Sequence, residues 1–309
     1  MVAGKGGVGK TTVGASLGLA AAQDGFDVLL IELEGHSNLG AAFGCDQLGY
    51  EDQLLVASDT RTSTADGPTT AGQLRGRQLT PERALRDYLD THEIGKIANR
   101  LAGSGLIDLV ASAVPGIRDV VTLGKIRQLE ESSAADLIIV DAPASGHSLT
   151  FLTSAGGLQN VVEDGPIRTQ ADQVAEMLAD QNRCQTILVT LPEQTPVSEV
   201  VDTAFRIEDE LDIHLGPVVV NTVIGGTNRA YPEELTQALR TPKVDPRARL
   251  AGEYRLQKAT AQQTEVVRLA QELPLSQVLL PALDTPRIGR EDLALLASEI
   301  RSQLAETPL

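Results

Sequence analysis

The chain has 309 residues, a formal net charge of −16 at pH 7, and 42% hydrophobic but only 3% aromatic residues. This negative charge disfavours non-specific binding to nucleic acid or to an anionic membrane surface, so we expect no nucleic-acid partner and at most indirect membrane contact. No apolar run reaches the roughly 18 residues of a membrane span, and no signal segment is recognisable, which predicts a cytoplasmic protein.

A glycine-rich loop opens the chain. Residues 4–11 read GKGGVGKT and match the phosphate-loop pattern GxxxxGK[ST]. In such a loop, backbone N–H groups bind phosphate oxygens at a helix N-terminus, Lys10 neutralises the β and γ phosphates of ATP, and the Thr11 hydroxyl ligates Mg²⁺. The predicted nucleotide-binding residues of this segment are Gly4, Gly6, Gly7, Val8, Gly9, Lys10, Thr11 and Thr12.

The strand before this loop is short. Only the three residues Met1 to Ala3 stand before Gly4, whereas a buried strand commonly has about five or six residues. We therefore expect a truncated N-terminal strand. Either residues upstream of Met1 belong to the working protein, or this form is less stable than related proteins with a full strand.

The rest of the chain alternates short aliphatic runs with helix-like stretches. Continuous apolarity is typical of strands that are covered on both faces, which predicts an α/β fold with a doubly wound, mostly parallel sheet in one domain, residues 1–309. We expect a helical insertion over about 80–129, further helical segments over about 155–180 and 231–273, and a surface loop over Ser58–Gln78. The expected strands are Phe26–Ile31, Leu137–Val140, Thr186–Val189, Pro217–Val220 and Val278–Leu280.

A second lysine, Lys5, lies inside the loop. The pattern GKGGVGKT resembles the deviant phosphate loop of MinD, ParA, the nitrogenase iron protein and ArsA, which are P-loop NTPases of the SIMIBI type. The resemblance implies that Lys5 reaches across a dimer to the nucleotide of the partner chain. The alternative is a solvated lysine without a role in catalysis.

The residues after the aliphatic run Leu137–Val140 narrow this group. Residues Asp141–Leu152 read DAPASGHSLTFL and align without gaps with the ArsA signature DTAPTGHTLRFL. The chain therefore resembles ArsA-type ATPases, which include the arsenite-pump ATPase and the eukaryotic ATPase that targets tail-anchored membrane proteins. By this resemblance, Asp141 lies on the Mg²⁺ side of the nucleotide, and Gly146 offers a backbone N–H to the γ-phosphate.

A third segment resembles the family near residue 34. Residues 32–43 read ELEGHSNLGAAF, and the family segment reads STDPAHNLSDAF, which aligns Glu34 with the catalytic aspartate that orients the attacking water. Glutamate is one methylene longer than aspartate, so a slow ATP-binding switch stays open as an alternative to a turnover enzyme. The acidic segment suggests a subfamily that we associate with actinobacterial ArsA-like ATPases.

Two later segments resemble the adenine pocket of the family. Asn221 follows the run Val218–Val220, and its amide offers both a donor and an acceptor to the adenine edge. The alternative is an asparagine that bonds locally at a strand end. Pro281 lies in a segment that resembles the loop over the adenine ring, and an ordinary strand exit is the alternative there.

Features of the known cargo-binding relatives are missing. Arsenite-pump members bind the metalloid through clustered cysteines, whereas Cys45 and Cys184 are far apart in the sequence. The targeting members have a methionine-rich groove and a CxxC clasp, but this chain has two methionines and no CxxC. We therefore expect a dimer with itself or with a paralogous ArsA-like chain, and a protein client that the sequence does not identify.

A different class of function is a MinD- or ParA-like spatial organiser, in which ATP gates attachment and turnover is negligible. Such attachment needs a basic amphipathic C-terminal helix or a basic surface, whereas Arg290–Leu304 contains acidic residues. A redox protein like the nitrogenase iron protein would need bridging cysteines in other positions. We therefore expect Mg²⁺-dependent ATP hydrolysis. The expected catalytic residues are Lys5, Lys10, Glu34 and Asp141, and the expected metal ligands are Thr11 and Asp141.

Overall fold

The structure is a computed structural model. It describes residues 1–33, 39–45, 47–57, 63–64, 67–68, 72–91, 116–143, 145–241 and 245–306. The strands are β1 (Val2–Ala3), β2 (Asp27–Leu33), β3 (Gln53–Ala57), β4 (Ser63–Thr64), β5 (Gly67–Pro68), β6 (Gln73–Leu79), β7 (Leu137–Asp141), β8 (Ile187–Thr190), β9 (Val218–Val223) and β10 (Gln277–Pro281). The helices are α1 (Lys10–Gln23), α2 (Leu39–Ala42), α3 (Pro81–Thr91), α6 (Ile117–Glu131), α7 (Ser145–Gln159), α8 (Pro166–Ala179), α9 (Gln194–Leu211), α10 (Tyr231–Leu239), α11 (Pro246–Glu272) and α12 (Arg290–Glu306).

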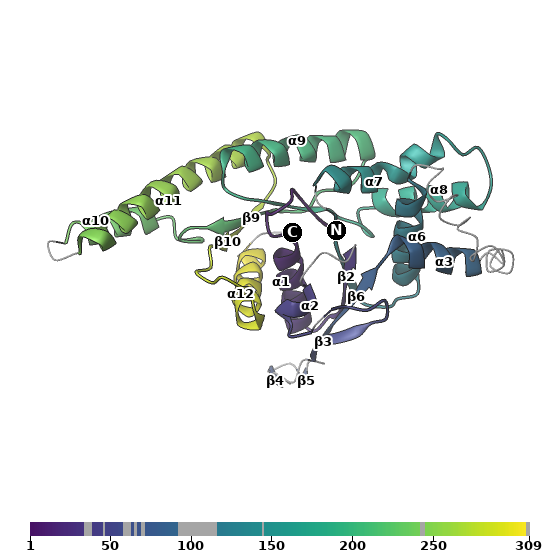
Figure 1. Cartoon of the computed structure of the whole chain (residues 1–309), viewed down its shortest axis with the longest axis horizontal. Helices are drawn as coiled ribbons and strands as arrows, with labels where there is room; N and C mark the ends of the chain where they lie inside the picture. The colour runs from purple at the N-terminus through teal and green to yellow at the C-terminus, as the bar shows by residue number, and fades with distance from the viewer. Residues whose placement is uncertain are drawn as a thin grey trace.

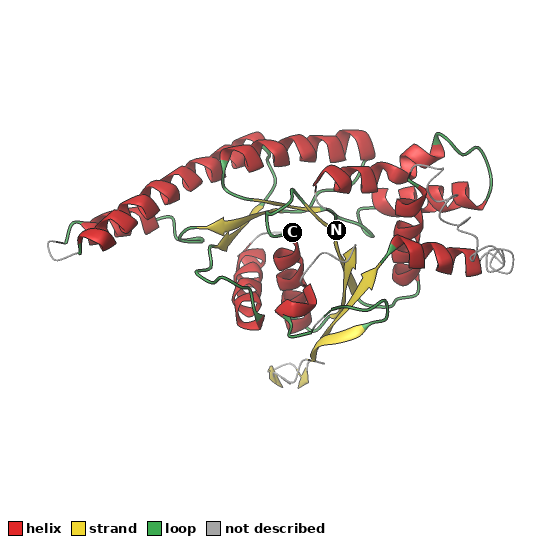
Figure 2. Ribbon diagram, viewed as in Figure 1, coloured by secondary structure: helices red, strands yellow, loops and turns green. Residues whose placement is uncertain are grey.

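Within the described residues, eight strands form one sheet in the order β10-β9-β8-β1-β7-β2-β6-β3. Neighbouring strands run parallel, except that β3 is antiparallel to β6. The short strand β1 lies between β7 and β8, with Val2 opposite both Asp141 and Ile187. Because parallel neighbours need crossover connections, helices cover both faces of the sheet, as Figures 1 and 2 show. The predicted doubly wound, mostly parallel α/β fold is confirmed.

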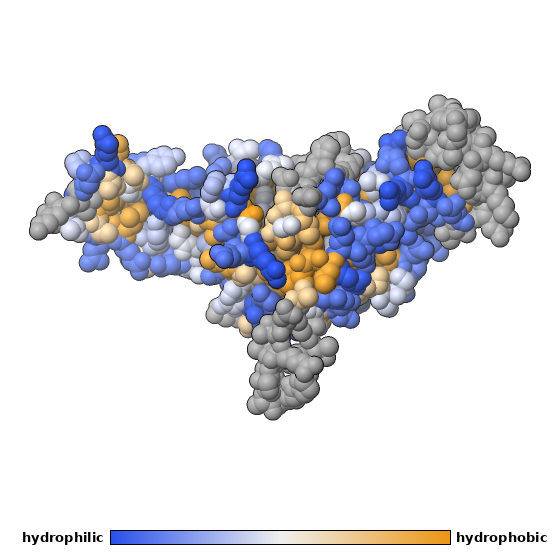
Figure 3. Space-filling view, turned by 60° about the horizontal axis from the view of Figure 1, so that its bottom comes forward, coloured by the Kyte–Doolittle hydropathy of each residue, from blue (hydrophilic) through white to orange (hydrophobic). Residues whose placement is uncertain are grey.

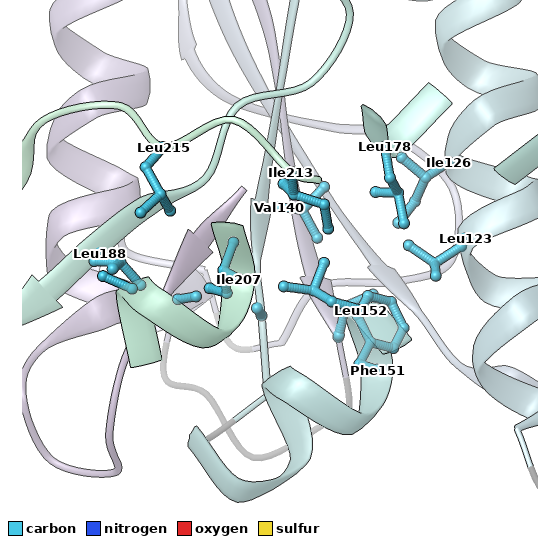
Figure 4. Close-up of a cluster of buried hydrophobic side chains, with 14 of the residues drawn as sticks. Leu123, Ile126, Val140, Phe151, Leu152, Leu178, Leu188, Ile207, Ile213 and Leu215 are labelled. Carbon is cyan, nitrogen blue, oxygen red and sulfur yellow. The ribbon is translucent and has the colours of Figure 1, made fainter. Parts of the chain in front are cut away.

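Alternate residues of the strands enter different hydrophobic cores. Leu29 and Ile31 of β2 pack with the core that α6, α7, α8 and α9 cover, whereas Val28 and Leu30 pack with the core under α1 and α12. All four side chains are fully buried. Figure 4 shows part of the first core, in which side chains from four helices surround Val140 of β7. Burial on both faces explains why the strands read as continuous aliphatic runs.

Helices extend from the sheet at both ends of the molecule. At one end, α3, α6 and α8 form a helical group, in which Leu85 and Tyr88 of α3 pack against Val121 of α6. At the other end, α10 and the first half of α11 project away from the sheet (Figure 1). We call this projection the arm and define it as residues 231–239 and 246–258. Within the predicted helical segments over 80–129, 155–180 and 231–273, the structure has α3, most of α6, the end of α7, α8, α10 and α11, and residues 92–115 lie outside the described part.

The arm buries few side chains. Within the described residues, α10 has no buried residue, and the buried residues of α11 all belong to its second half. Leu250 and Tyr254 are 70% and 68% exposed. Figure 3 shows hydrophobic residues in orange on the arm, at the left end of the molecule. The arm is therefore held mainly by contacts within and between its own two helices, while the second half of α11 packs against the sheet.

The prediction that Ser58–Gln78 is a surface loop was wrong for its last residues. Residues Gln73–Leu79 form β6, which pairs with β2 along its whole length. The strand was hidden because Arg75 and Arg77 interrupt its apolar pattern. Arg75 forms ion pairs with Asp27 and Asp52, and Arg77 forms one with Asp52, so both charges are compensated by residues distant in the sequence.

A cavity of about 660 Å³ lies at the amino-terminal end of β1. Its lining is mainly apolar and includes Phe26, Leu137 and Ile138. The Met1 ammonium is buried beside it and donates a hydrogen bond to the Gln185 carbonyl oxygen at 2.5 Å. Burial lowers the pKa of this ammonium from its usual value of 8.0. Among the described helices, none is both long and apolar enough to cross a membrane.

Candidate functional site

The glycine-rich loop connects β1 to α1 at the carboxyl end of the sheet, and its backbone requires glycine. Gly4 has φ of 151°, and a Cβ there would lie 2.3 Å from the Val189 carbonyl oxygen of β8. Gly9 has φ of 90° and caps the N-terminus of α1. A larger residue at either position would clash and would adopt an unfavourable backbone conformation. The loop therefore follows the sheet edge closely and presents the N-terminus of α1, where backbone N–H groups favour an anion.

Three side chains meet at this edge of the sheet. Lys10 and Thr11 begin α1, and Asp141 ends β7, the strand next to β1. The Thr11 hydroxyl donates to Asp141 Oδ2 at 2.6 Å. Lys10 Nζ donates to the Lys5 carbonyl oxygen at 3.2 Å, which holds the ammonium over the loop. The structure thus brings together three residues that the sequence assigned to phosphate and metal binding.

The electrostatics of this group are those of a partly desolvated site. Burial raises the pKa of Asp141, while the hydrogen bond from Thr11 and the charge of Lys10 oppose the shift. Burial lowers the pKa of Lys10, and the charge of Asp141 opposes that shift. Among the described residues, no group donates a hydrogen bond to Asp141 Oδ1, which is buried. A buried carboxylate oxygen without a partner fits a position that a cation completes.

The oxygen ligands suit Mg²⁺ rather than a softer metal. A hydroxyl and a carboxylate are hard ligands, and Mg²⁺ in proteins usually keeps waters and phosphate oxygens as its remaining ligands. No group of three or more His, Cys, Asp or Glu side chains that could hold a metal ion occurs in the described part of the chain. Thr11 and Asp141 would therefore hold a metal ion only together with phosphate and water.

Lys5 has a partner within its own chain. Its ammonium forms an ion pair with the Glu199 carboxylate of α9, and the two side chains are 45% and 41% exposed. Both residues line a cavity of about 250 Å³ together with Gly4 and Val8 of the loop. An exposed ion pair of this kind contributes little to stability and exchanges readily. Another anion could therefore replace Glu199 as the partner of the Lys5 ammonium.

Asn221 lies directly behind the loop. It is 7% exposed, and its Nδ2 donates to the Val8 carbonyl oxygen at 2.9 Å. Its Oδ1 accepts from the Thr222 N–H, also at 2.9 Å. A Cβ at Gly9 would lie 2.3 Å from Nδ2, so Asn221 also explains why that position is glycine. The amide keeps one hydrogen and one lone pair for a ligand, and its contact with adenine stays a prediction.

Other predicted residues are placed less closely. Pro281 ends β10 opposite Val223 of β9. Thr12 follows Thr11 on α1, and Gly146 lies in the first turn of α7, directly after the β7 strand. Glu34, the predicted catalytic carboxylate, lies outside the described residues, and β2 ends one residue before it at Leu33.

The sequence did not single out two buried polar residues of this region. Glu32 of β2 is 3% exposed and lies opposite Asp141 in the sheet. The signal for it was present, because a carboxylate interrupts an aliphatic run. Gln262 of α11 is 4% exposed and bonds to the end of β9. Nothing in the local sequence distinguishes Gln262 from the neighbouring glutamine at position 263.

Comparisons with known proteins agree with this geometry. The model of the ArsA-type family of anion-transporting ATPases matches residues 1–168. The ATPase BagA of Mycobacterium tuberculosis is 30% identical over 245 residues, which cover 77% of this chain and 68% of that protein. The ATPase GET3 of Pyricularia oryzae is 33% identical over 155 residues, which cover 49% of this chain and 41% of that protein. The region that the family model matches contains the loop, β2, β7 and α7.

Proposed function

The chain belongs to the ArsA family of anion-transporting ATPases, and we propose that it hydrolyses ATP with Mg²⁺ as a dimer in which each chain supplies Lys5 to the other. The observation that carries the Mg²⁺ part is the contact of the Thr11 hydroxyl with the buried Asp141, whose second oxygen has no hydrogen-bond donor among the described residues. When bound, Mg²⁺ would neutralise charge on the β and γ phosphates. The residues that bind it also fix where the phosphates lie.

The protein residues have separate tasks in this proposal. The loop N–H groups and Lys10 bind the phosphates at the N-terminus of α1. Asp141 and Thr11 orient the metal ion, and Asn221 supports the loop from behind. By the family resemblance, Glu34 orients the attacking water. Phosphoryl transfer of this kind depends mainly on positioning and on charge stabilisation, which a rigid loop on a buried strand provides.

The proposal for the dimer rests on Lys5. Its ammonium pairs with Glu199 of α9 through an exposed contact. In a dimer, the phosphates of the partner's nucleotide would replace Glu199 as the anion. Because a nucleotide carries several charges and Glu199 carries one, the exchange is favourable once the chains are close.

A mixing experiment tests the exchange of lysines. The variant Lys5→Ala has an intact Lys10 but supplies no lysine to a partner, and Lys10→Ala supplies Lys5 but lacks its own phosphate lysine. Each variant alone should hydrolyse ATP slowly. An equimolar mixture should regain activity, because a mixed dimer contains one complete site. A mixture no more active than the two variants measured separately would contradict the exchange and leave Lys5 with a role in its own chain.

The choice between an enzyme and an ATP-gated switch needs a second experiment. Glu34→Gln should bind ATP with the affinity of the wild type and hydrolyse it more slowly, because the carboxylate that orients water is lost. A Lys258→Ala variant on the arm serves as a control for purification and folding. Wild-type turnover as slow as that of Glu34→Gln would favour the switch. The same ATP-bound Glu34→Gln protein is suited to capturing a client or a paralogous partner.

A further inference from the structure

The end of β9, next to the phosphate loop, has an irregular backbone. Thr222 is a β-branched residue with φ of 61°, a conformation that glycine adopts readily and threonine rarely. Pairing with β10 also becomes irregular here, because the register shifts between Leu279 and Pro281. Pro281 lies opposite Val223 and has no N–H to donate. Regular pairing with β10 therefore does not fix this turn of the backbone.

A glutamine from α11 adds side-chain hydrogen bonds on both sides of Val223. Gln262 Oε1 accepts from the Ile224 N–H at 2.8 Å, and its Nε2 donates to the Thr222 carbonyl oxygen at 3.2 Å. One side-chain amide thus bonds to the backbone on both sides of Val223. With 4% exposure, Gln262 is well shielded from water, so both bonds hold the end of β9 strongly.

The next contacts lead to the phosphate loop. The Thr222 N–H donates to Asn221 Oδ1, and Asn221 Nδ2 donates to the Val8 carbonyl oxygen, both at 2.9 Å. The Thr222 N–H points to Asn221 Oδ1, and the φ angle of Thr222 sets how this N–H is turned relative to the Thr222 carbonyl that Gln262 holds. The left-handed conformation therefore relates the backbone that Gln262 holds to the N–H that bonds the Asn221 amide facing Val8.

We propose that Gln262 is a positioning residue for nucleotide binding. It holds Thr222 in the left-handed conformation, so that the Asn221 amide supports the phosphate loop at Val8. This inference rests on the proposed nucleotide site. Since Gln262 and the arm belong to the same helix, α11 connects the arm to the loop through four hydrogen bonds.

The test measures the dissociation constant of ATP and the steady-state kcat and KM of Gln262→Met, which keeps the length of the side chain and removes the amide. The matched control is Gln263→Met, whose amide donates to the Arg229 carbonyl oxygen and, among the described residues, makes no hydrogen bond to β9. We expect Gln262→Met to weaken ATP binding and raise KM by about tenfold, the size expected for the loss of a buried hydrogen bond, with kcat at saturation nearly unchanged. The control should bind ATP like the wild type. Equal affinities for both variants would overturn the inference.

A second variant separates positioning from a general loss of structure. Glycine adopts the left-handed conformation without strain, and Thr222 is exposed, so Thr222→Gly removes little packing. Adding Thr222→Gly to Gln262→Met should therefore restore most of the ATP affinity. A folded double variant that still binds ATP as weakly as Gln262→Met would overturn the inference. This comparison remains decisive if Gln262→Met alone is unstable.

A double-mutant cycle with Asn221→Ala completes the test. Because Gln262 acts through Asn221, the two substitutions together should weaken ATP binding no more than Asn221→Ala alone. Effects that multiply would show that Gln262 acts by another route and would overturn the inference. A wild-type chain that binds no ATP at all would instead contradict the proposed function, so the two failures are distinguishable.

Discussion

The phosphate loop and the arm are held by different kinds of contact. At the loop, residues far apart in the sequence bond directly: Thr11 with Asp141, Lys5 with Glu199, and Asn221 with Val8. On the arm, the contacts are mainly between α10 and α11, which follow one another in the sequence. Arg249 donates to the Leu239 carbonyl oxygen, and the Asp245 side chain caps α11. A substitution at the loop should therefore change both activity and stability, whereas one on the arm should leave both nearly unchanged.

The two regions also differ in what they expose. The loop presents backbone N–H groups and charged side chains above a buried floor, as a small anionic ligand requires. The arm exposes large side chains, Leu250 and Tyr254, on a helix that buries nothing nearby. The chemistry therefore belongs to the phosphate loop. The arm can vary without affecting hydrolysis.

The largest effect is expected at Lys10. Lys10→Ala removes the ammonium that lies over the loop, and ATPase activity should fall by roughly 100-fold or more, as is typical when a charge-stabilising group is lost. Lys258→Ala on the arm removes the same charge in the same type of substitution and should keep wild-type activity. Steady-state hydrolysis at saturating ATP and Mg²⁺ measures both. Equal losses in the two variants would remove the distinction between loop and arm.

Asp141→Asn should separate activity from stability. Loss of the carboxylate should lower Mg²⁺-dependent turnover by roughly 100-fold. Without nucleotide or metal, the same variant should melt at a higher temperature than the wild type at pH 7, because burial raises the pKa of Asp141 and makes its ionised form unfavourable in the folded state.

The stabilising effect of Asp141→Asn should depend on pH. A raised pKa in the folded state stabilises the wild type fully below the unfolded value of 3.8, and this contribution is lost as pH rises through the folded value. The advantage of Asp141→Asn should therefore be present at pH 7 and shrink as the pH approaches 4. Thermal melts by circular dichroism over this range measure it. An advantage that grows toward low pH would contradict the assignment.

The sequence predicted the elements whose apolar residues are consecutive. β2 and β7 were predicted because both faces of each strand are buried, and the carboxylate at the end of β7 identified Asp141. β6 was missed because its arginines pair with Asp27 of β2 and with Asp52, which directly precedes β3. Ion pairs between distant residues leave no periodic signal in the sequence.

The site residues likewise divide into those that a local motif predicts and those that only long-range contacts define. Lys10 and Thr11 follow from a local motif, and in the structure Thr11 bonds to Asp141 while Lys10 interacts electrostatically with it. Asn221 was predicted to lie at the site, but its support of Val8 was not, because that hydrogen bond joins residues 213 positions apart. Gln262 could not be predicted at all, since its partners are backbone atoms of another element and any sequence supplies those.

A smaller effect is expected beneath the loop, at the cavity beside β1. Adding five apolar residues before Met1 should raise the melting temperature by roughly 5 °C or more, because side chains of an extended strand would bury apolar surface against Leu137 and Ile138. An extension of five glycine and serine residues is the matched control and should give little change. Equal melting temperatures of the two extended forms would show that the cavity does not accept a strand.

The Met1 ammonium offers an independent check of the same cavity. Burial lowers its pKa from 8.0, so its charge destabilises the folded chain at neutral pH. This cost disappears as pH rises from the lowered value through 8.0, and the melting temperature should gain accordingly. The apolar extension replaces the ammonium by an amide and should remove this gain. A gain of the same size in the extended form would assign it to another group.

The smallest effect is expected on the arm. The double substitution Leu250→Ser and Tyr254→Ser should change the free energy of unfolding by no more than about 0.5 kcal/mol and leave hydrolysis unchanged, because both side chains are mostly exposed. Leu269→Ala on the same helix is the matched contrast. Leu269 is fully buried against the sheet, so its truncation should cost roughly 2–5 kcal/mol.

Urea unfolding at constant protein concentration compares the three proteins. If the arm variant loses as much stability as Leu269→Ala, the arm is packed against something in solution, and a change of its unfolding midpoint with protein concentration would identify that contact as a second copy of the chain. If it loses none, α11 divides at about Lys258 into an exposed part and a part that supports the sheet. The arm then ends where the side chains of α11 become buried, because the helix itself is continuous at that point.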